Sequence, residues 1–292
     1  MSDAQTLGFI GTGVMGEPMC RNLAAKSARR VLAWDPRREP LERLEAQGVA
    51  IAGAADEVAR AAAIVFVCLP GGAQLESLCE TALLPAARAG LTLVDLGTSG
   101  VGRTRRLAGR FAERGADYAD APIARTREAA RKGTLAISVG ASPEVFERIR
   151  PLLACVGTDI THCGGVGTGQ VVKILNNMVL FQTVNALAEA LALGRRAGVD
   201  PELLFDALAK GSADSFALRN HGMKAMLPGA YPERAFSVEY AAKDNGYALE
   251  LGRETGVRLR GAHLLAGLLE EAKTAGLGED YWPVIARIVD RG

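Results

Sequence analysis

A lysine and two asparagines stand close together in a stretch of the chain that is otherwise made of apolar and small residues. Lys173 and Asn177 are four residues apart, and Asn176 directly precedes Asn177. Residues four apart share one face of a helix, which would bring the amine and the amide of this pair together. Such groups are costly to bury unless they are paired. On its own, the group could be a packed polar cluster between domains, and its place in an apolar helix calls for an explanation from the rest of the chain.

Glycines at fixed spacing form a second candidate site, directly after a β-rich run over residues 7–10. The segment consists of Gly11, Thr12, Gly13, Val14, Met15 and Gly16. Gly11 would allow a tight turn, Gly13 the close approach of a pyrophosphate, and Gly16 tight packing of the following helix on the strand. The helix N-terminus would offer N–H groups and a positive dipole end to the phosphates. This context predicts a dinucleotide site, with an ordinary glycine turn as the alternative.

A carboxylate stands where such a site would read the adenosine ribose. Asp35 ends the second β-rich run, 19 residues after Gly16. There it would accept hydrogen bonds from the ribose hydroxyls and repel a 2′-phosphate, which favours NAD over NADP. Two alternatives stay open: Asp35 could merely cap the helix expected after Pro36, and the neighbouring Arg37 and Arg38 could accommodate the 2′-phosphate of NADP.

Alternating β-rich runs and helical stretches would position these residues. Residues 64–68 and 91–95 are continuous apolar runs, which are typical of strands buried on both faces. Stretches such as 37–47 and 103–114 carry helix-forming residues with charged faces. The alternation predicts an α/β fold, with an N-terminal Rossmann domain over residues 1–165 built on a doubly wound parallel sheet.

The character of the chain changes after this first region. From about residue 167 to residue 197 the pattern is that of one long helix without proline, and the remainder contains few β-rich runs. We expect residues 166–292 to form an all-α domain for substrate binding and oligomerisation, joined to the first domain through the long helix. No uninterrupted apolar run reaches the length needed to span a membrane.

The composition is that of an ordinary globular protein, with 49% hydrophobic and 23% charged residues among 292. A net charge of +1 gives no reason to expect nucleic acid or an anionic membrane as a partner. The five cysteines form no CxxC pair and the three histidines have no metal-ligand spacing, so we expect free thiols and no metal. The N-terminus has no basic segment followed by an apolar one, and we therefore expect a cytoplasmic protein without a signal peptide.

Several motifs in a fixed order resemble the β-hydroxyacid dehydrogenase superfamily, whose members include 3-hydroxyisobutyrate dehydrogenase. The glycine loop and the G-x-G-x-x-x-K-x-x-N-N segment that starts at Gly167 carry the resemblance. Further matches are Leu69-Pro70, Thr98, Asp120-Ala121-Pro122, Gly133-Thr134-Leu135, and Phe236 followed by Lys243-Asp244. The resemblance covers nearly the whole chain.

The resemblance implies an NAD(P)-dependent oxidoreductase that transfers a hydride between the cofactor and a small β-hydroxy acid or semialdehyde. It implies that Lys173 is the general acid/base, and that Asn177 or Asn176 orients the substrate and helps to hold the lysine. The residues that it implies for lining the cofactor are Leu69, Pro70, Thr98 and Lys243. It also implies a homodimer or homotetramer formed through the helical domain.

One segment departs from the common family pattern. Where many members carry Ser-Gly-Gly, this chain has Ile123-Ala124-Arg125-Thr126. A guanidinium can bind a carboxylate or sulfonate through two N–H groups, so we expect Arg125 and Thr126 to bind an anionic head group of the substrate. The loop is similar to that of sulfolactaldehyde reductases, but Leu180 replaces the hydroxyl residue that those enzymes use, and a sulfonate is not secured. The alternative is that Arg125 points to solvent.

Two other functions remain as alternatives. Imine reductases resemble this superfamily but usually replace the lysine of the long helix, so Lys173 counts against them. A non-catalytic nucleotide-binding protein would have no use for the complete Lys-x-x-Asn-Asn segment.

Overall fold

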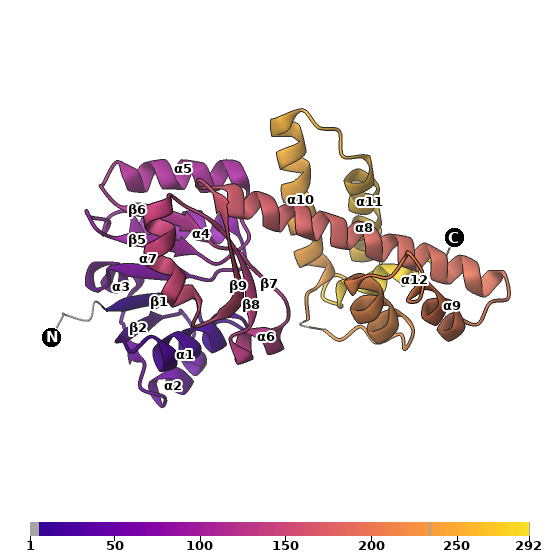
Figure 1. The fold of residues 1–292 in the computed structure, drawn as a ribbon, viewed down its shortest axis with the longest axis horizontal. Coiled ribbons are helices and arrows are strands. Elements are labelled where there is room, and N and C mark those ends of the chain that lie inside the picture. Colours follow the sequence, from indigo (N-terminus) through magenta and orange to yellow (C-terminus); the bar gives the residue numbers. More distant parts are fainter. Residues whose placement is uncertain (1–5, 234, 292) are drawn as a thin grey trace. The chain divides into compact units, whose positions relative to one another are not determined.

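The structure is a computed structural model that describes residues 6–233 and 235–291. The chain divides into two compact units, Met1–Lys173 and Ile174–Gly292 (Figure 1). Residues 1–5, on which the expectation of no signal peptide partly depends, lie outside the described part. The predicted boundary at residue 165 precedes the long helix, whereas the compact units divide within it.

The first unit is built on a sheet of nine strands among its described residues, in the order β3-β2-β1-β4-β5-β6-β8-β7, with β9 beside β8. The strands are β1 (Leu7–Ile10), β2 (Val31–Trp34), β3 (Ala50–Ile51), β4 (Ile64–Val67), β5 (Thr92–Asp95), β6 (Asp117–Asp120), β7 (Ile123–Ala124), β8 (Leu135–Gly140) and β9 (Gly157–Gly164). Strands β1 to β6 pair in parallel, but β8 is antiparallel to β6 and β7. The expected doubly wound α/β fold is thus confirmed, with a parallel sheet that becomes mixed at β8. Apolar strand patterns do not encode direction, and the connection from β6 returns the chain the opposite way.

Helices cover both faces of this sheet. They are α1 (Gly16–Lys26), α2 (Arg38–Glu45), α3 (Ala55–Ala61), α4 (Gly72–Leu78), the π-helix η1 (Cys79–Leu83), α5 (Val101–Ala112), α6 (Arg127–Lys132) and α7 (Pro143–Leu153). One buried cluster includes Leu23 of α1 and Ile149 of α7, and the other includes Val58 of α3 and Phe111 of α5. Two cores separated by a sheet are the mark of the doubly wound fold.

The strand order places a topological switch between β1 and β4. From β1 the chain moves to β2 and β3 on one side, and then to β4 on the other. In open α/β sheets, ligands bind in the crevice outside the carboxyl ends of the strands at such a point. The glycine loop begins where β1 ends, so it lies at this crevice.

The second unit is helical. After the long helix α8 (Thr168–Arg196) come α9 (Pro201–Leu208), the π-helix η2 (Leu218–Met226), α10 (Val238–Thr255), α11 (Arg260–Thr274), the 3-10 helix η3 (Trp282–Val284) and α12 (Ile285–Val289). Its core contains Phe181, Phe205 and Trp282, all fully buried. The aromatic rings of Phe181 and Trp282 meet edge to face with their centres 4.8 Å apart.

By length and composition alone, α8 is long and apolar enough to cross a membrane, although it contains no uninterrupted apolar run of that length. Polar residues interrupt the apolar pattern of this helix, but its mean hydropathy is still high enough for a membrane span. Phe181, Val184 and Leu187 of α8 are buried in the core of the second unit. A core helix of a globular domain meets the same criterion, so its length carries no further conclusion.

Candidate active site

The glycine loop has a backbone that side chains would disrupt. Gly11 has a φ of +88°, in the left-handed region, and a Cβ on it would clash with the carbonyl oxygen of Cys68. A Cβ on Gly16 would clash with the carbonyl oxygen of Gly11. The loop thus packs closely on the end of β4 and on its own first residue, as the sequence predicted.

The outer side of the loop leaves room and polar groups for a phosphate. The nearest atom to a Cβ placed on Gly13 is Nη2 of Arg37, at 3.6 Å. The Oγ1 of Thr12 is buried and has no hydrogen-bond partner among the described residues. The helix α1 begins at Gly16 without a side-chain cap from Met15, so the positive end of the helix dipole faces the loop, although the Glu17 N–H already donates to the Gly13 carbonyl. These features fit the pyrophosphate of a dinucleotide.

Asp35 is buried at the end of β2 and is held by two neighbours. Its Oδ2 accepts the Thr12 N–H at 2.7 Å, and its Oδ1 accepts the Arg37 N–H at 3.0 Å. The guanidinium of Arg37 donates to both oxygens, at 3.0 and 3.1 Å. Burial raises the pKa of Asp35, but the hydrogen bonds from Arg37 and Thr12 outweigh it, so the pKa lies below its usual value. Asp35 thus joins the glycine loop to the turn before α2 as an ionised carboxylate.

The ends of β4 and β5 bring further predicted residues to the same edge of the sheet. Leu69 and Pro70 lie in the loop after β4, separated from the strand by Cys68, and Thr98 is half-buried in the turn after β5. Within that turn the Gly97 N–H donates to Oδ1 of Asp95 at 2.8 Å. The carboxyl ends of parallel neighbours meet at one edge, so the loops after β1, β4 and β5 lie together.

Two buried polar residues meet at the start of α8: Asp120 at the end of β6, and Gln170 in the first turn, which the sequence analysis did not single out. Asp120 accepts the Gly167 N–H at 2.6 Å and the Gln170 N–H at 2.7 Å. Burial raises the pKa of Asp120 to about 6, although these backbone hydrogen bonds lower it. Gln170 is itself fully buried, and its amide reaches the turn that holds Thr98. A glutamine three residues before the lysine, in a segment of small and apolar residues, was the available signal.

Lys173 lies on the same continuous helix, one turn before Asn177, as the spacing predicted. In the second unit, Asn177 is buried and its Nδ2 donates to Oδ2 of Asp244 at 2.8 Å. The Nδ2 of Asn176 donates to Oδ1 of Asn177 at 3.1 Å. Lys243 reaches the other oxygen of Asp244 at 3.1 Å. Asp244 therefore connects Asn177 of α8 to Lys243 of α10, a role that the sequence did not reveal.

The predicted anion-binding arginine is paired within its own unit. Nη1 of Arg125 donates to the carbonyl of Thr134 at 2.7 Å and to Oγ1 of Thr158 at 3.2 Å, and its Nη2 lies 2.7 Å from Oδ2 of Asp159. Arg125 has a φ of +88°, a conformation that favours glycine. Thr126 caps α6 by accepting the Ala129 N–H at 3.3 Å. Arg125 is thus held by hydrogen bonds and an ion pair rather than pointing freely to solvent. To bind this guanidinium, a substrate anion would have to displace the carboxylate of Asp159.

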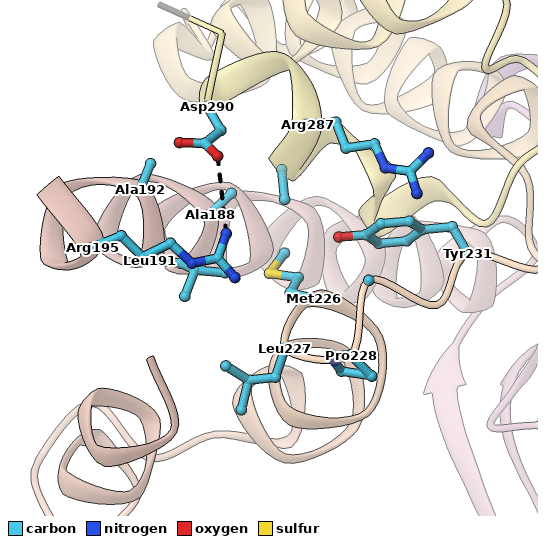
Figure 2. Close-up of a pocket in the computed structure, with 12 residues that line it drawn as sticks. Ala188, Leu191, Ala192, Arg195, Met226, Leu227, Pro228, Tyr231, Arg287 and Asp290 are labelled. Carbon is cyan, nitrogen blue, oxygen red and sulfur yellow. Dashed lines mark ion pairs between the residues drawn. The ribbon is translucent and has the colours of Figure 1, made fainter. Parts of the chain in front are cut away.

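A separate pocket of about 240 Å³ lies in the helical unit (Figure 2). Leu191 and Met226 form part of its lining, with Arg195 facing Asp290 at 3.9 Å and the Arg287 guanidinium 4.9 Å from the centre of the Tyr231 ring. None of the predicted site residues lines this pocket. Across residues 6–233 and 235–291, no group of three or more His, Cys, Asp and Glu side chains is placed to hold a metal ion.

Comparison with known proteins settles the family. Residues 6–165 match the sequence model of the NAD-binding domain of 6-phosphogluconate dehydrogenase. Residues 167–287 match the model described as the NAD-binding domain of NADP-dependent 3-hydroxyisobutyrate dehydrogenase. The chain belongs to the β-hydroxyacid dehydrogenase superfamily.

Individual relatives agree over nearly the full length. The chain is 35% identical over 290 residues to 2-(hydroxymethyl)glutarate dehydrogenase of Eubacterium barkeri, covering 99% of this chain and 96% of that protein. It is 36% identical to 2-hydroxy-3-oxopropionate reductase of Escherichia coli, and the match covers 87% of this chain and 86% of that protein. The structure of Mycobacterium tuberculosis 3-hydroxyisobutyrate dehydrogenase with L-serine superposes with a TM-score of 0.89 at 27% identity, covering 98% and 99%. The chain is an NAD(P)-dependent oxidoreductase of small hydroxy acids.

Proposed function

We propose that this enzyme interconverts a small β-hydroxy acid and its semialdehyde, both carrying an anionic head group, with Lys173 as the general acid/base. The observation that carries the proposal is the arrangement on α8, where Lys173 lies one turn before an Asn177 whose amide is held by Asp244. An amine at this place can exchange a proton with the substrate oxygen while a hydride leaves or joins the carbon.

The proton and the hydride leave the alcohol by separate routes. In the oxidation direction the amine of Lys173 takes the hydroxyl proton as the carbonyl forms, and in reduction the ammonium returns it to the oxygen. When bound, the nicotinamide cofactor accepts or supplies the hydride at its ring. Asn177 is kept in one orientation because Asp244 accepts from its Nδ2 and Asn176 donates to its Oδ1. We infer that the two asparagines orient the substrate hydroxyl beside the amine.

We infer NAD as the preferred cofactor. The ionised Asp35 at the end of β2 favours ribose hydroxyls over a 2′-phosphate. Leu69, Pro70 and Thr98 would line the cofactor from the first unit, and we assign Lys243 of the second unit to the same role. The guanidinium of Arg37 lies beside Asp35 and keeps NADP open as a weaker alternative.

The proposed substrate class follows from the relatives' names and from one arginine. The substrates named for the first two relatives are carboxylates with a hydroxymethyl or formyl carbon β to the acid group. In this chain we assign the anionic head group to Arg125, with Thr126 beside it. The Arg125 side chain is 43% exposed, and so is accessible to a carboxylate that replaces Asp159.

We also propose that the enzyme works in the cytoplasm as a homodimer or homotetramer formed through its helical unit. Support comes from large apolar side chains on the surface of that unit, Leu193 of α8 and Leu203 of α9, which are 70% and 63% exposed. Burying them against another copy would remove apolar surface from water.

A substrate panel tests the proposal. The panel contains 3-hydroxyisobutyrate, 2-(hydroxymethyl)glutarate, 2-hydroxy-3-oxopropionate, sulfolactaldehyde and a cyclic imine, each followed by NADH and NADPH absorbance. We expect turnover of at least one acid with NAD. Lys173→Ala should lower kcat by about 100- to 10,000-fold with NAD binding retained, whereas Lys224→Ala on the surface should not. Arg125→Ala should raise KM for the acid, with Arg127→Ala as its control. Turnover of the imine alone would favour imine reduction, and NAD binding without any turnover would favour a non-catalytic role.

A further inference from the structure

The N-terminus of α8 is tied to the end of β6 by a buried carboxylate. The side chain of Asp120 is fully buried, and its two oxygens accept the N–H groups of Gly167 and Gln170 at 2.6 and 2.7 Å. These N–H groups belong to the start of the helix, where no carbonyl of the same helix can accept them. The carboxylate therefore fixes the position of the first turn against the sheet.

Glycines allow this close approach. A Cβ on Gly169 would lie 2.8 Å from Oδ2 of Asp120 and would clash with the carbonyl of Ser138. Gly167 has a φ of +94° at the entry to the helix. The two glycines Gly167 and Gly169 are thus explained by the close packing of the start of α8 against β6 and β8.

A second tie runs from the same turn to the end of β5. The Oε1 of Gln170 accepts the Ser99 N–H at 3.0 Å, and its Nε2 donates to the Gly97 carbonyl at 2.9 Å. Gln170 is 0% exposed, and its bond to Ser99 is buried, whereas the bond to the Gly97 carbonyl is partly buried. The amide therefore binds the backbone on both sides of Thr98, the residue proposed to line the cofactor.

Helix geometry carries this constraint to Lys173. Lys173 follows Gln170 by three residues, which is less than one turn and a rise of about 4.5 Å along the helix axis. All of these groups belong to the first compact unit. A shift of Gln170 relative to the turn at Thr98 would shift the lysine backbone by a similar amount.

We propose that Gln170, with Asp120, is a positioning residue that sets the place of Lys173 relative to the cofactor turn at Thr98. This inference rests on the proposed role of Lys173. Apolar side chains could fill the same space, but they would leave the Ser99 N–H and the Gly97 carbonyl without partners. A buried amide that pairs both gives the helix one defined register on the sheet.

The test is a double-mutant cycle on the full-length enzyme, with the best substrate of the panel and NAD. The variants are Gln170→Met, Lys173→Ala and the double variant, with Gln47→Met on the surface as the matched control. Gln170→Met keeps the length of the side chain and removes its hydrogen bonds. We expect kcat to fall about 10- to 100-fold with KM and NAD binding within about threefold, because a misplacement of about 1 Å is sufficient for such a loss. In the Lys173→Ala background the same change should have no further effect.

Two readouts complement the kinetics. Hydrogen exchange should become faster in Gln170→Met at the Ser99 amide and in the first turn of α8, with no substrate present. As the pH is lowered, the activity of Gln170→Glu should approach that of the wild type measured at the same pH. The reason is that a protonated carboxyl can accept from the Ser99 N–H and donate to the Gly97 carbonyl as the amide does. If Gln170→Met does not fold, Asp120→Asn enters the same cycle, since it replaces one acceptor by a donor.

The outcomes separate the two claims. Full activity of Lys173→Ala would overturn the proposed function itself. An inactive Lys173→Ala together with an unimpaired Gln170→Met would overturn only the positioning role. An equal loss from Gln170→Met with and without Lys173 would also overturn it, because the glutamine would then act independently of the lysine.

Discussion

The carboxylate at the end of β2 offers a sharp test of cofactor preference. Replacing Asp35 by asparagine keeps the size of the side chain and one oxygen, which can still accept the Thr12 N–H. The substitution removes the negative charge and the second acceptor, Oδ1, to which Arg37 donates in the wild type. We therefore expect the glycine loop to keep its conformation and the binding of the adenosine ribose to change.

The magnitude follows from the type of hydrogen bond that is lost. A hydrogen bond to a charged group contributes about 1.5–3 kcal/mol, so losing it should weaken NAD binding by about 10- to 100-fold. NADP should gain, because the repulsion of its 2′-phosphate disappears and the guanidinium of Arg37, now 3.0 and 3.1 Å from Asp35, becomes available. The preference of Asp35→Asn should thus shift toward NADP by at least about tenfold.

Fluorescence titration with NADH and NADPH measures both affinities. The matched control is Asp56→Asn, which removes a carboxylate paired with Arg60 on the surface of the same unit. The double variant with Arg37→Ala should lose the gain in NADPH affinity. Unchanged NADH affinity in Asp35→Asn would refute the reasoning, since the carboxylate would then serve only to hold the turn before α2.

Two further predictions concern the helical unit. Burial lowers the pKa of His221 from 6.5 to about 4, and its Nδ1 lies 2.6 Å from the hydroxyl of Tyr281. The free energy of unfolding should therefore be highest above pH 6.5 and should fall by about 3 kcal/mol as the pH drops to 4 and below. Urea unfolding should show a weaker pH dependence in His221→Gln than in the wild type. An equal pH dependence of the two proteins would contradict this prediction. Light scattering should give the mass of two or four chains of 30.6 kDa, reduced in Leu193→Asp but not in the similarly exposed Val257→Asp. A monomeric wild type would rule out the proposed assembly.

Features that depend on local pattern could be predicted from the sequence. The glycine loop, the strands at 7–10 and 64–67 and the long helix are each determined by neighbouring residues, because turn geometry and hydrophobic periodicity act over a few positions. The spacing of Lys173 and Asn177 likewise fixes their shared helix face. The order of motifs then indicated the family, which the comparisons confirmed.

The tertiary structure alone decided which distant polar groups meet. Gln170 reaches Ser99, Asp120 caps the start of α8, and Asp244 holds Asn177, over separations of 71, 47 and 67 residues. Arg125, which follows β7, pairs with Asp159 on β9, which the sequence did not anticipate. The direction of β8 was also decided at this level. A buried polar side chain must find a partner, but its own sequence neighbourhood does not say which one; strand order and helix seating make that choice.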